Sequence, residues 1–296
     1  MIKTGIKLGL SGLLSIYEKC LDLGDYGYDV LSDLVNEPDN DLKETKPLIA
    51  HIPLLGKFSA FNPMELDLRS RKGEPYVPDQ FIDITEQYFQ FLVDRANADG
   101  ASGFLFEIYS PGGQIYPAKR IAEIITNEIK LPKIAYIRGD ACSGGYLVAS
   151  SCDYIVSHET CTQANISVIM SHEYYAHHRD GLTNDTISTG DKKDFNNPLK
   201  PNSKEEKKML MKIAKQFHKQ FIEFVAEHRG ISMKKMKKIA DGSMYHSLDA
   251  KRLGLIDMIG QKEDAIRYLE NIIGQESEVI KYSLRFKENP SSCEED

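Results

Sequence analysis

Two glycine-rich turns hold the residues whose types and spacing could perform chemistry. They are residues 110–113 (SPGG) and residues 141–146 (ACSGGY). Each turn follows an apolar stretch and precedes a helical pattern, so each is expected to join a strand to a helix. A serine at a helix start beside small residues is open to a substrate, and the Gly144 N–H and the helix dipole could stabilise an oxyanion there. Either turn alone is better explained as a tight strand–helix connection.

A serine nucleophile also needs a base. The sequence contains no G-x-S-x-G elbow, and no histidine is obviously paired with Ser143. Lys193, within residues 190–198 (GDKKDFNNP), is a candidate. A lysine acts as a base only when it is neutral, and burial lowers a lysine pKa from its usual value of about 10.4. Local sequence alone indicates a surface lysine, so the residues by themselves leave the base open.

The elements that would position these residues alternate along the chain. Apolar runs predict strands at 48–54, 104–109, 133–137, 154–157, 186–188 and 255–259. Helical spacing predicts helices at 83–98, 117–129, from 143, and at 204–228, 232–240, 247–253 and 262–273. The helix at 204–228 has a capping box, Ser203 with Glu206, and Gly230 follows its end. The alternation predicts an α/β fold of stacked βαβ units with a mainly parallel sheet and a helical C-terminal region.

The chain divides into four expected parts. Residues 1–35 should form a helical segment, 36–46 an acidic linker, 47–275 one α/β domain, and 276–296 a polar acidic tail without order. The first segment has the spacing of an amphipathic helix, which would pack on the domain or, less favoured, lie on a membrane surface. No apolar run reaches the roughly 18–20 residues that span a bilayer, so we expect no transmembrane segment.

Composition excludes several classes of function. The 296 residues carry 37 Lys and Arg against 44 Asp and Glu, a formal net charge of −7, which argues against nucleic-acid binding. Five scattered cysteines form no CxxC pair, which favours a reducing compartment. His172, His177 and His178 are five or six apart rather than four, so they do not form a zinc-protease pair. We expect no metal and no cofactor.

The ordered motifs together resemble a known family. Along the chain they are SPGG, ACSGGY, G-x-x-K-x-x-x-x-P at 190–198, a long helix ending in FVAEHRG, and LDAKRLGLIDMIG. In this order and spacing they resemble the short, single-repeat members of the signal peptide peptidase (SppA, protease IV) family of serine peptidases, and their phage capsid-protease relatives. The resemblance extends over most of the expected domain. It implies the Clp protease/crotonase fold and a serine–lysine dyad that works without a metal.

The resemblance also implies roles for individual residues. Ser143 matches the family's nucleophile, and Lys193 matches its general base. The backbone N–H groups of Gly144 and of Gly113, or of its neighbour Gly112, match the oxyanion hole.

One position departs from the family pattern. The family usually has T-G-S-I-G-V between the two catalytic residues, whereas residues 163–168 read QANISV. Asn165 therefore stands where a serine orients the lysine, and its carbonyl oxygen can accept a hydrogen bond from an amine. The first hypothesis that the resemblance implies is a serine endopeptidase that hydrolyses membrane-derived signal peptides or other unfolded peptides through an acyl-enzyme. The departure at Asn165 keeps a second hypothesis open, a catalytically inactive SppA-like scaffold or binding module. A third hypothesis is a phage-type capsid maturation protease. An acyl-CoA enzyme of the crotonase type is a distant fourth, because it would leave Ser143 and Lys193 unexplained.

Partners and location follow from charge and from the resemblance. We expect peptide or unfolded-protein substrates, and ring assembly in the family implies a homo-oligomer. Lysines outnumber acids between 200 and 238, which indicates the solvated faces of two helices. An anionic membrane surface or an acidic segment of a neighbouring subunit is the alternative. The expected location is cytoplasmic, with peripheral membrane contact as the alternative.

Overall fold

The computed structural model describes residues 46–60, 83–174, 187–190 and 192–283. The chain forms two compact units, Met1–Thr45 and Lys46–Asp296, and every described residue belongs to the second. The expected N-terminal helical segment and nearly all of the expected linker lie outside the described residues.

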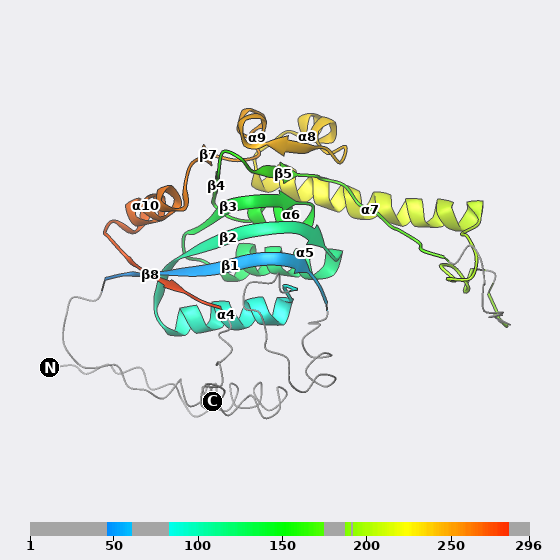
Figure 1. The fold of residues 1–296 in the computed structure, drawn as a ribbon, viewed down its shortest axis with the longest axis horizontal. Coiled ribbons are helices and arrows are strands. Elements are labelled where there is room, and N and C mark those ends of the chain that lie inside the picture. The colour runs from blue at the N-terminus through cyan, green and yellow to red at the C-terminus, as the bar shows by residue number, and fades with distance from the viewer. Residues whose placement is uncertain (1–45, 61–82, 175–186, 191, 284–296) are drawn as a thin grey trace, which may run out of the picture. The chain divides into compact units, whose positions relative to one another are not determined.

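A mainly parallel sheet forms the centre of the described unit (Figure 1). Its strands are β1 Leu48–Phe58, β2 Ala101–Gly113, β3 Lys133–Cys142, β4 Tyr154–Ser157, β5 Thr162–Ala164, β6 Met244–His246, β7 Met258–Ile259 and β8 Glu278–Lys281. The order β6-β5-β3-β2-β1-β8 is parallel throughout except for the β5–β6 pair. Strand β3 forks, because its first half pairs with β4 and its last residues pair with β5.

Helices cover both faces of the sheet. They are α4 Glu86–Ala98, α5 Ile115–Glu123 with a π turn at Ile124–Glu128, α6 Gly144–Ser150, α7 Lys204–His228, α8 Met233–Ile239, α9 Ser247–Leu253 and α10 Lys262–Ile273. The larger apolar core joins one sheet face to α4, α5, α6 and the end of α7. A smaller core joins the other face to α10 through Ala265 and Leu269. The predicted α/β class with a mainly parallel sheet is confirmed.

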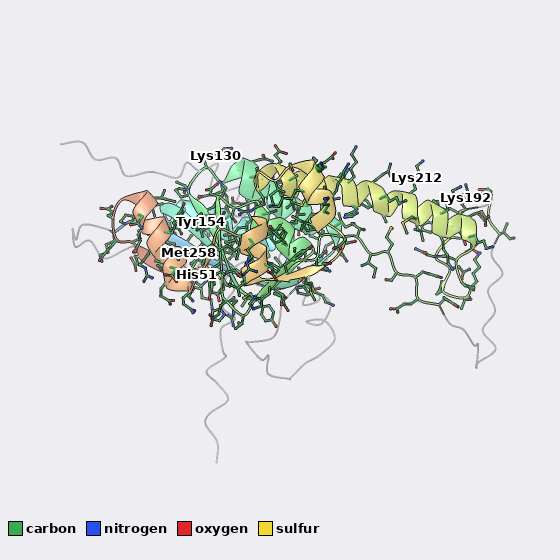
Figure 2. All side chains as sticks on the ribbon, turned by 90° about the horizontal axis from the view of Figure 1, so that it is seen from above. His51, Lys130, Tyr154, Lys192, Lys212 and Met258 are labelled. Carbon is green, nitrogen blue, oxygen red and sulfur yellow. The ribbon has the colours of Figure 1, made fainter. Side chains whose placement is uncertain are left out.

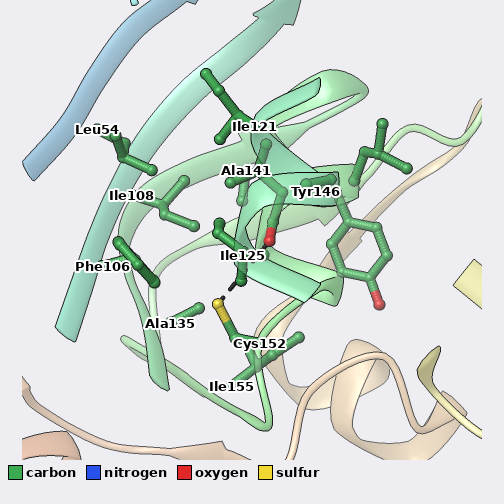
Figure 3. Packing of buried hydrophobic residues seen from close by; sticks show 14 of the residues in the cluster. Leu54, Phe106, Ile108, Ile121, Ile125, Ala135, Ala141, Tyr146, Cys152 and Ile155 are labelled. Atoms are coloured by element: carbon green, nitrogen blue, oxygen red, sulfur yellow. Dashed lines mark hydrogen bonds between the residues drawn. The ribbon is translucent and has the colours of Figure 1, made fainter. Parts of the chain in front are cut away.

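Helix α6 is held deep in the larger core (Figure 3). Tyr146 is fully buried and belongs to the same apolar cluster as Ile108 of the sheet and Ile121 of α5. Every residue of α6 is buried, so its position is fixed by packing on all sides. The turn that begins α6 therefore sits on a rigid base.

Helix α7 begins and ends as its sequence predicts. Ser203 and Glu206 form the capping box, and the helix ends at His228. The hydrophobic stripe of α7 is buried mainly near its C-terminal end, at Ile222, Phe224 and Val225. Its N-terminal half extends beyond the sheet (Figure 1).

The structure differs from the sequence prediction in several segments. β5 and β6 form where no strand was predicted, and of the strand predicted at 255–259 only β7 forms. Residues 278–281, within the expected tail, form β8, which pairs in parallel with β1. The backbone of β1 has an open edge there, so a short strand can pair with it although all four of its own residues are exposed. The predicted strand at 186–188 is wrong for Ile187 and Ser188, which form no strand, and Ile187 is 95% exposed. Thr186 lies outside the described residues.

Candidate active site

Ser143 occupies the turn between β3 and α6. It is the N-cap of α6, with φ 52° and ψ −120°. A side chain at positive φ costs free energy, and such strain gathers at functional sites. The Ser143 N–H donates to the Ala164 carbonyl of β5 at 2.8 Å. The serine is therefore held in a strained turn that presents its side chain at a helix N-terminus.

The glycine-rich turn after β2 lies directly against Ser143. A Cβ on Gly112 would be 2.8 Å from Ser143 Cβ and 3.0 Å from the Gly144 nitrogen, so only glycine fits. The Gly112 N–H donates to Ser110 Oγ at 3.1 Å. The structure thus brings the predicted nucleophile and the three predicted oxyanion-hole glycines into one small region. The Gly112 N–H is already bonded to Ser110, which leaves Gly113 and Gly144 as the candidate donors to an oxyanion.

Two backbone N–H groups near Ser143 are suited to an oxyanion. Gly144 is the first residue of α6, where an N–H has no partner within its helix. Gln114 N–H donates to Phe58 O of β1 at 2.8 Å. Gly113 precedes Gln114 and lines the same cleft as Ser143 and Gly144, so its N–H is the second candidate.

Cys142, beside Ser143, is suited to packing rather than to chemistry. It is buried, its Sγ lies 3.5 Å from Met244 Sδ, and burial raises the pKa of its thiol. A thiol that stays protonated is a poor nucleophile. Of the two neighbouring residues, Ser143 is the one that can react.

Ser143 opens into a cleft of about 100 Å³. The walls come from three parts of the chain, namely residues 113–119 around the start of α5, residues 143–147 of the α6 turn, and residues 167–169 facing α7. Phe217 and Phe221 of α7 complete it, and both are half-buried. The lining is mostly apolar, with Gln114, Lys119 and Gln220 as its longest polar side chains.

Lys119 lines the same cleft as Ser143 within one chain. Its Nζ lies 3.5 Å from Glu123 Oε1 and 4.2 Å from the centre of the Phe224 ring. A carboxylate and an aromatic face both stabilise an ammonium group. The Lys119 amine is therefore directed at Glu123 and the Phe224 ring.

Asn165 follows β5, one residue after the carbonyl that binds Ser143. Ala164 and Asn165 both have positive φ, 83° and 49°. The Asn165 N–H donates to Ser243 O at 2.9 Å, and its side-chain Nδ2 donates to Gly242 O at 2.6 Å. These bonds fix the side chain and leave its Oδ1 as the atom able to accept a hydrogen bond from an amine.

Lys193 lies far from Ser143 in the same chain. It is exposed, and it precedes a compact turn in which Asp194 binds Lys200 at 2.6 Å next to the start of α7. Its neighbour Lys192 lies at the projecting end of α7 (Figure 2). From Lys204 to Phe217 at the cleft, the helix rises by about 20 Å. One chain therefore does not bring the predicted base to the predicted nucleophile.

Neither a metal site nor a membrane span is found in the part of the chain that the structure describes. No group of three or more His, Cys, Asp or Glu residues within those ranges could hold a metal ion. Among the same residues, no helix has both the length and the apolar character needed to cross a bilayer.

Sequence reasoning missed two contributors to the site. Ser110 binds the Gly112 N–H, and its carbonyl would lie 2.8 Å from a Cβ on Gly145. The Tyr146 hydroxyl donates to Leu255 O at 2.7 Å and so ties α6 to the loop after α9. Both residues belong to the two glycine-rich motifs. Their roles could not be predicted, because their hydrogen-bond partners depend on tertiary contacts.

The chain is similar to several known peptidases. The family model Peptidase family S49 matches residues 125–275. A protein of Methanocaldococcus jannaschii that is named as a candidate protease is 34% identical over 72% of this chain and 70% of its own length. A candidate signal peptide peptidase SppA of Enterococcus faecium is 33% identical over 62% of this chain. The chain spans only 55% of that second relative.

A solved structure shares the fold. The membrane-bound stomatin-specific protease 1510-N superposes over 81% of this chain and 100% of its own, with a TM-score of 0.51 and 15% identity. At this identity the match supports the fold alone, while the family model and the M. jannaschii relative carry the assignment. The resemblance to the SppA family is confirmed, and the chain belongs to peptidase family S49, a family of serine proteases.

Proposed function

We propose that this chain is a serine peptidase in which Ser143 is the nucleophile. The observation that carries the proposal is the conformation of Ser143, which has φ 52° at the start of α6 and opens into the cleft. A strained serine at a helix N-terminus, with its side chain directed at a cleft, suits attack on a carbonyl.

The proposed reaction runs through an acyl-enzyme. Ser143 Oγ attacks the peptide carbonyl carbon while Lys193 Nζ takes its proton, and the N–H groups of Gly144 and Gly113 bind the oxyanion. Lys193 then passes the proton to the leaving amine as the C–N bond breaks. Water, deprotonated by the same lysine, attacks the ester and releases the acid and Ser143.

The proposed base must come from a second copy of the chain. Lys193 is exposed, and its neighbour Lys192 lies at the projecting end of α7, about 20 Å of helix from the cleft of the same chain. An exposed lysine on a projecting arm can enter the cleft of a neighbouring subunit. Asn165 Oδ1 would then accept a hydrogen bond from its amine, which is the proposed orienting role.

The proposed substrates are extended peptides. A cleft of about 100 Å³ holds a side chain or two rather than a folded surface. Its apolar walls, including Phe217 and Phe221, favour an apolar side chain next to the scissile bond. Signal peptides and other unfolded, apolar segments have this chemistry.

Intact-mass analysis after treatment with a fluorophosphonate tests the nucleophile and the base. We expect one adduct on the wild type, none on Ser143→Ala and none on Lys193→Ala. Lys192→Ala and Lys119→Ala are matched controls and should label normally. Loss of labelling in Lys119→Ala instead would move the base to Lys119. An unlabelled wild type, even when assembled, would favour an inactive scaffold.

Mixing two inactive variants tests whether the dyad spans two chains. In a mixed oligomer of Ser143→Ala and Lys193→Ala, some sites combine an intact serine from one chain with an intact lysine from the other. Random mixing makes such sites a quarter of the total, so about one quarter of wild-type labelling should return. No recovery from a mixture that does assemble would show that each chain supplies its own base.

A further inference from the structure

A second hollow, larger than the cleft at Ser143, lies along the projecting half of α7. Its volume is about 610 Å³, against about 100 Å³ for the cleft. One wall is the N-terminal half of α7, and the other is the chain that follows β5. We call it the arm groove, and its apolar walls are Val168, Ile169 and Met170 on one side and Leu210, Met211 and Ala214 on the other.

The wall that follows β5 runs in extended form along α7. Two hydrogen bonds hold its ends, because His218 of α7 donates to Ile166 O at 3.2 Å, and His172 donates to Lys200 O at 3.0 Å, shortly before α7 begins. From its first residue to His218, α7 rises by about 21 Å. Residues 166–172 cover a similar length only when nearly extended. Figure 1 shows this part of the chain beside α7.

The extended wall leaves both its backbone and its apolar side chains free. Among the described residues, no backbone hydrogen bond involves residues 167–171. Ile169 is 90% exposed and Met211, on the facing wall, is 56% exposed. A peptide backbone can pair with such a free edge, and adjacent apolar pockets then take its side chains. The arm groove therefore has the features of a site for an extended peptide.

The polar side chains at the ends of the groove already have partners. His172 is bonded to Lys200 O, as described above. Asn202 donates to Asn196 Oδ1 at 2.8 Å and accepts from the Asn196 N–H at 3.2 Å. What remains open in the groove is mainly apolar surface, which favours apolar side chains of the peptide.

The arm groove is continuous with the cleft at Ser143. Val168 and Ile169 line both hollows, and α7 forms a wall of each. From Leu210 in the groove, α7 rises by about 10 Å to Phe217 and about 16 Å to Phe221 in the cleft. An extended peptide advances about 3.3 Å per residue, so this distance corresponds to about three to five residues.

We propose that the arm groove binds apolar side chains of an extended peptide substrate, about three to five residues from the bond that Ser143 attacks. The position of that bond rests on the proposed function, whereas the groove and its apolar character do not. The groove would select unfolded segments with several apolar residues over those with a single apolar residue at the cleft. Continuity with the cleft and the free backbone edge favour a peptide over a second copy as the occupant.

Peptide binding to the full-length Ser143→Ala variant tests the groove without requiring catalysis. Two fluorescein-labelled peptides of about 12 residues, which extend to about 40 Å, share a central leucine. One has leucine at the third to fifth positions on both sides of the centre, and the other has serine there. Fluorescence anisotropy should show that the leucine peptide binds at least about tenfold more tightly.

Substitutions in the groove then assign the preference to its walls. In the Ser143→Ala background, Met211→Glu and Met170→Glu, on opposite walls, should each remove most of the tenfold ratio. Met211→Leu should keep it. Ile272→Glu is the matched control, because Ile272 is an exposed apolar residue of α10, on the other face of the sheet, and its substitution should leave the ratio unchanged.

The proposal is wrong if the two peptides bind Ser143→Ala equally, or if both groove variants keep the full ratio. It is also wrong if Met211→Glu dissociates an assembled chain in sedimentation velocity, since the groove would then be an interface between copies. Fluorophosphonate labelling of the wild type reports separately on the proposed function. An unlabelled wild type would count against Ser143 as nucleophile, while the peptide ratio would still decide what the groove binds.

Discussion

Replacing Ser143 by glycine and by alanine separates the strain of the turn from the loss of the hydroxyl. Both variants lack the nucleophile, so they differ only in the Cβ. Ser143 has φ 52° and ψ −120°, a conformation in which an L side chain is crowded and glycine is not. We expect the glycine variant to be the more stable of the two.

The size of the difference follows from two opposing terms. A non-glycine residue in such a region costs of order 1–3 kcal/mol. The greater freedom of glycine in the unfolded chain offsets about 0.5–1 kcal/mol of that gain. The net expectation is that Ser143→Gly unfolds with about 1 kcal/mol more free energy than Ser143→Ala. For a domain of this size, that difference raises the melting temperature by about 2–4 °C.

Urea unfolding of both variants measures this difference, and Ser150 supplies the control. Ser150 is buried at the end of α6 in ordinary helical backbone. At Ser150, the glycine variant should therefore be less stable than the alanine variant by about 1 kcal/mol. The opposite order at Ser143 and Ser150 is the diagnostic result. If alanine is the more stable variant at both positions, the strain argument for Ser143 is refuted.

Two further predictions concern close packing and pH. Gly112→Ala puts a Cβ 2.8 Å from Ser143 Cβ, so fluorophosphonate labelling should fall roughly 100-fold. Gly190→Ala is the control and should label normally, because a Cβ on Gly190 would have no atom within 4 Å. The hydrogen bond from His51, with nearby cations, lowers the pKa of Glu107 from 4.5 to about 2, so this carboxylate stabilises the fold above pH 4.5. That contribution is lost as the pH falls from 4.5 toward 2. Over this range the unfolding free energy of the wild type should fall by about 3 kcal/mol more than that of Glu107→Gln. Equal pH slopes in urea titrations of the two proteins would contradict this.

The parts of the fold that local sequence specifies were predictable. Helix α7 is bounded by a capping box at Ser203 and by Gly230, and both signals act within a few residues. The buried strands β1, β2 and β3 are long apolar runs, which need no knowledge of their partners. Elements with a strong local sequence signal were therefore predicted correctly.

The short strands were not predictable for the opposite reason. β5, β6 and β8 have only three or four residues each, and β8 is exposed throughout. No periodicity can be read from so few residues, and each forms because a neighbouring strand offers an open edge. β5 matters most, because the Ala164 carbonyl at its end binds the Ser143 N–H.

One part of the candidate site could likewise be predicted from the sequence, and another part could not. Ser143 and its glycines belong to two turns that the neighbouring strands β2 and β3 bring together, and the family resemblance predicted that they meet. Lys193 is different, because motif spacing gives its distance along the chain and not in space. The 25-residue α7 that separates it from the cleft is visible in the sequence, but its direction is not.

The strain at Ser143 persists because its surroundings leave it no other conformation. The Ser143 N–H is bonded to Ala164, Gly112 lies against its Cβ, and α6 is fixed by the buried Tyr146 and its bond to Leu255. Relaxing φ would break the first bond and displace a fully buried helix, each at a cost comparable to the strain itself. The chain thus holds its proposed nucleophile rigidly and carries its proposed base on an exposed arm. Rigid presentation of Ser143 and delivery of Lys193 by a neighbour would together make activity depend on assembly.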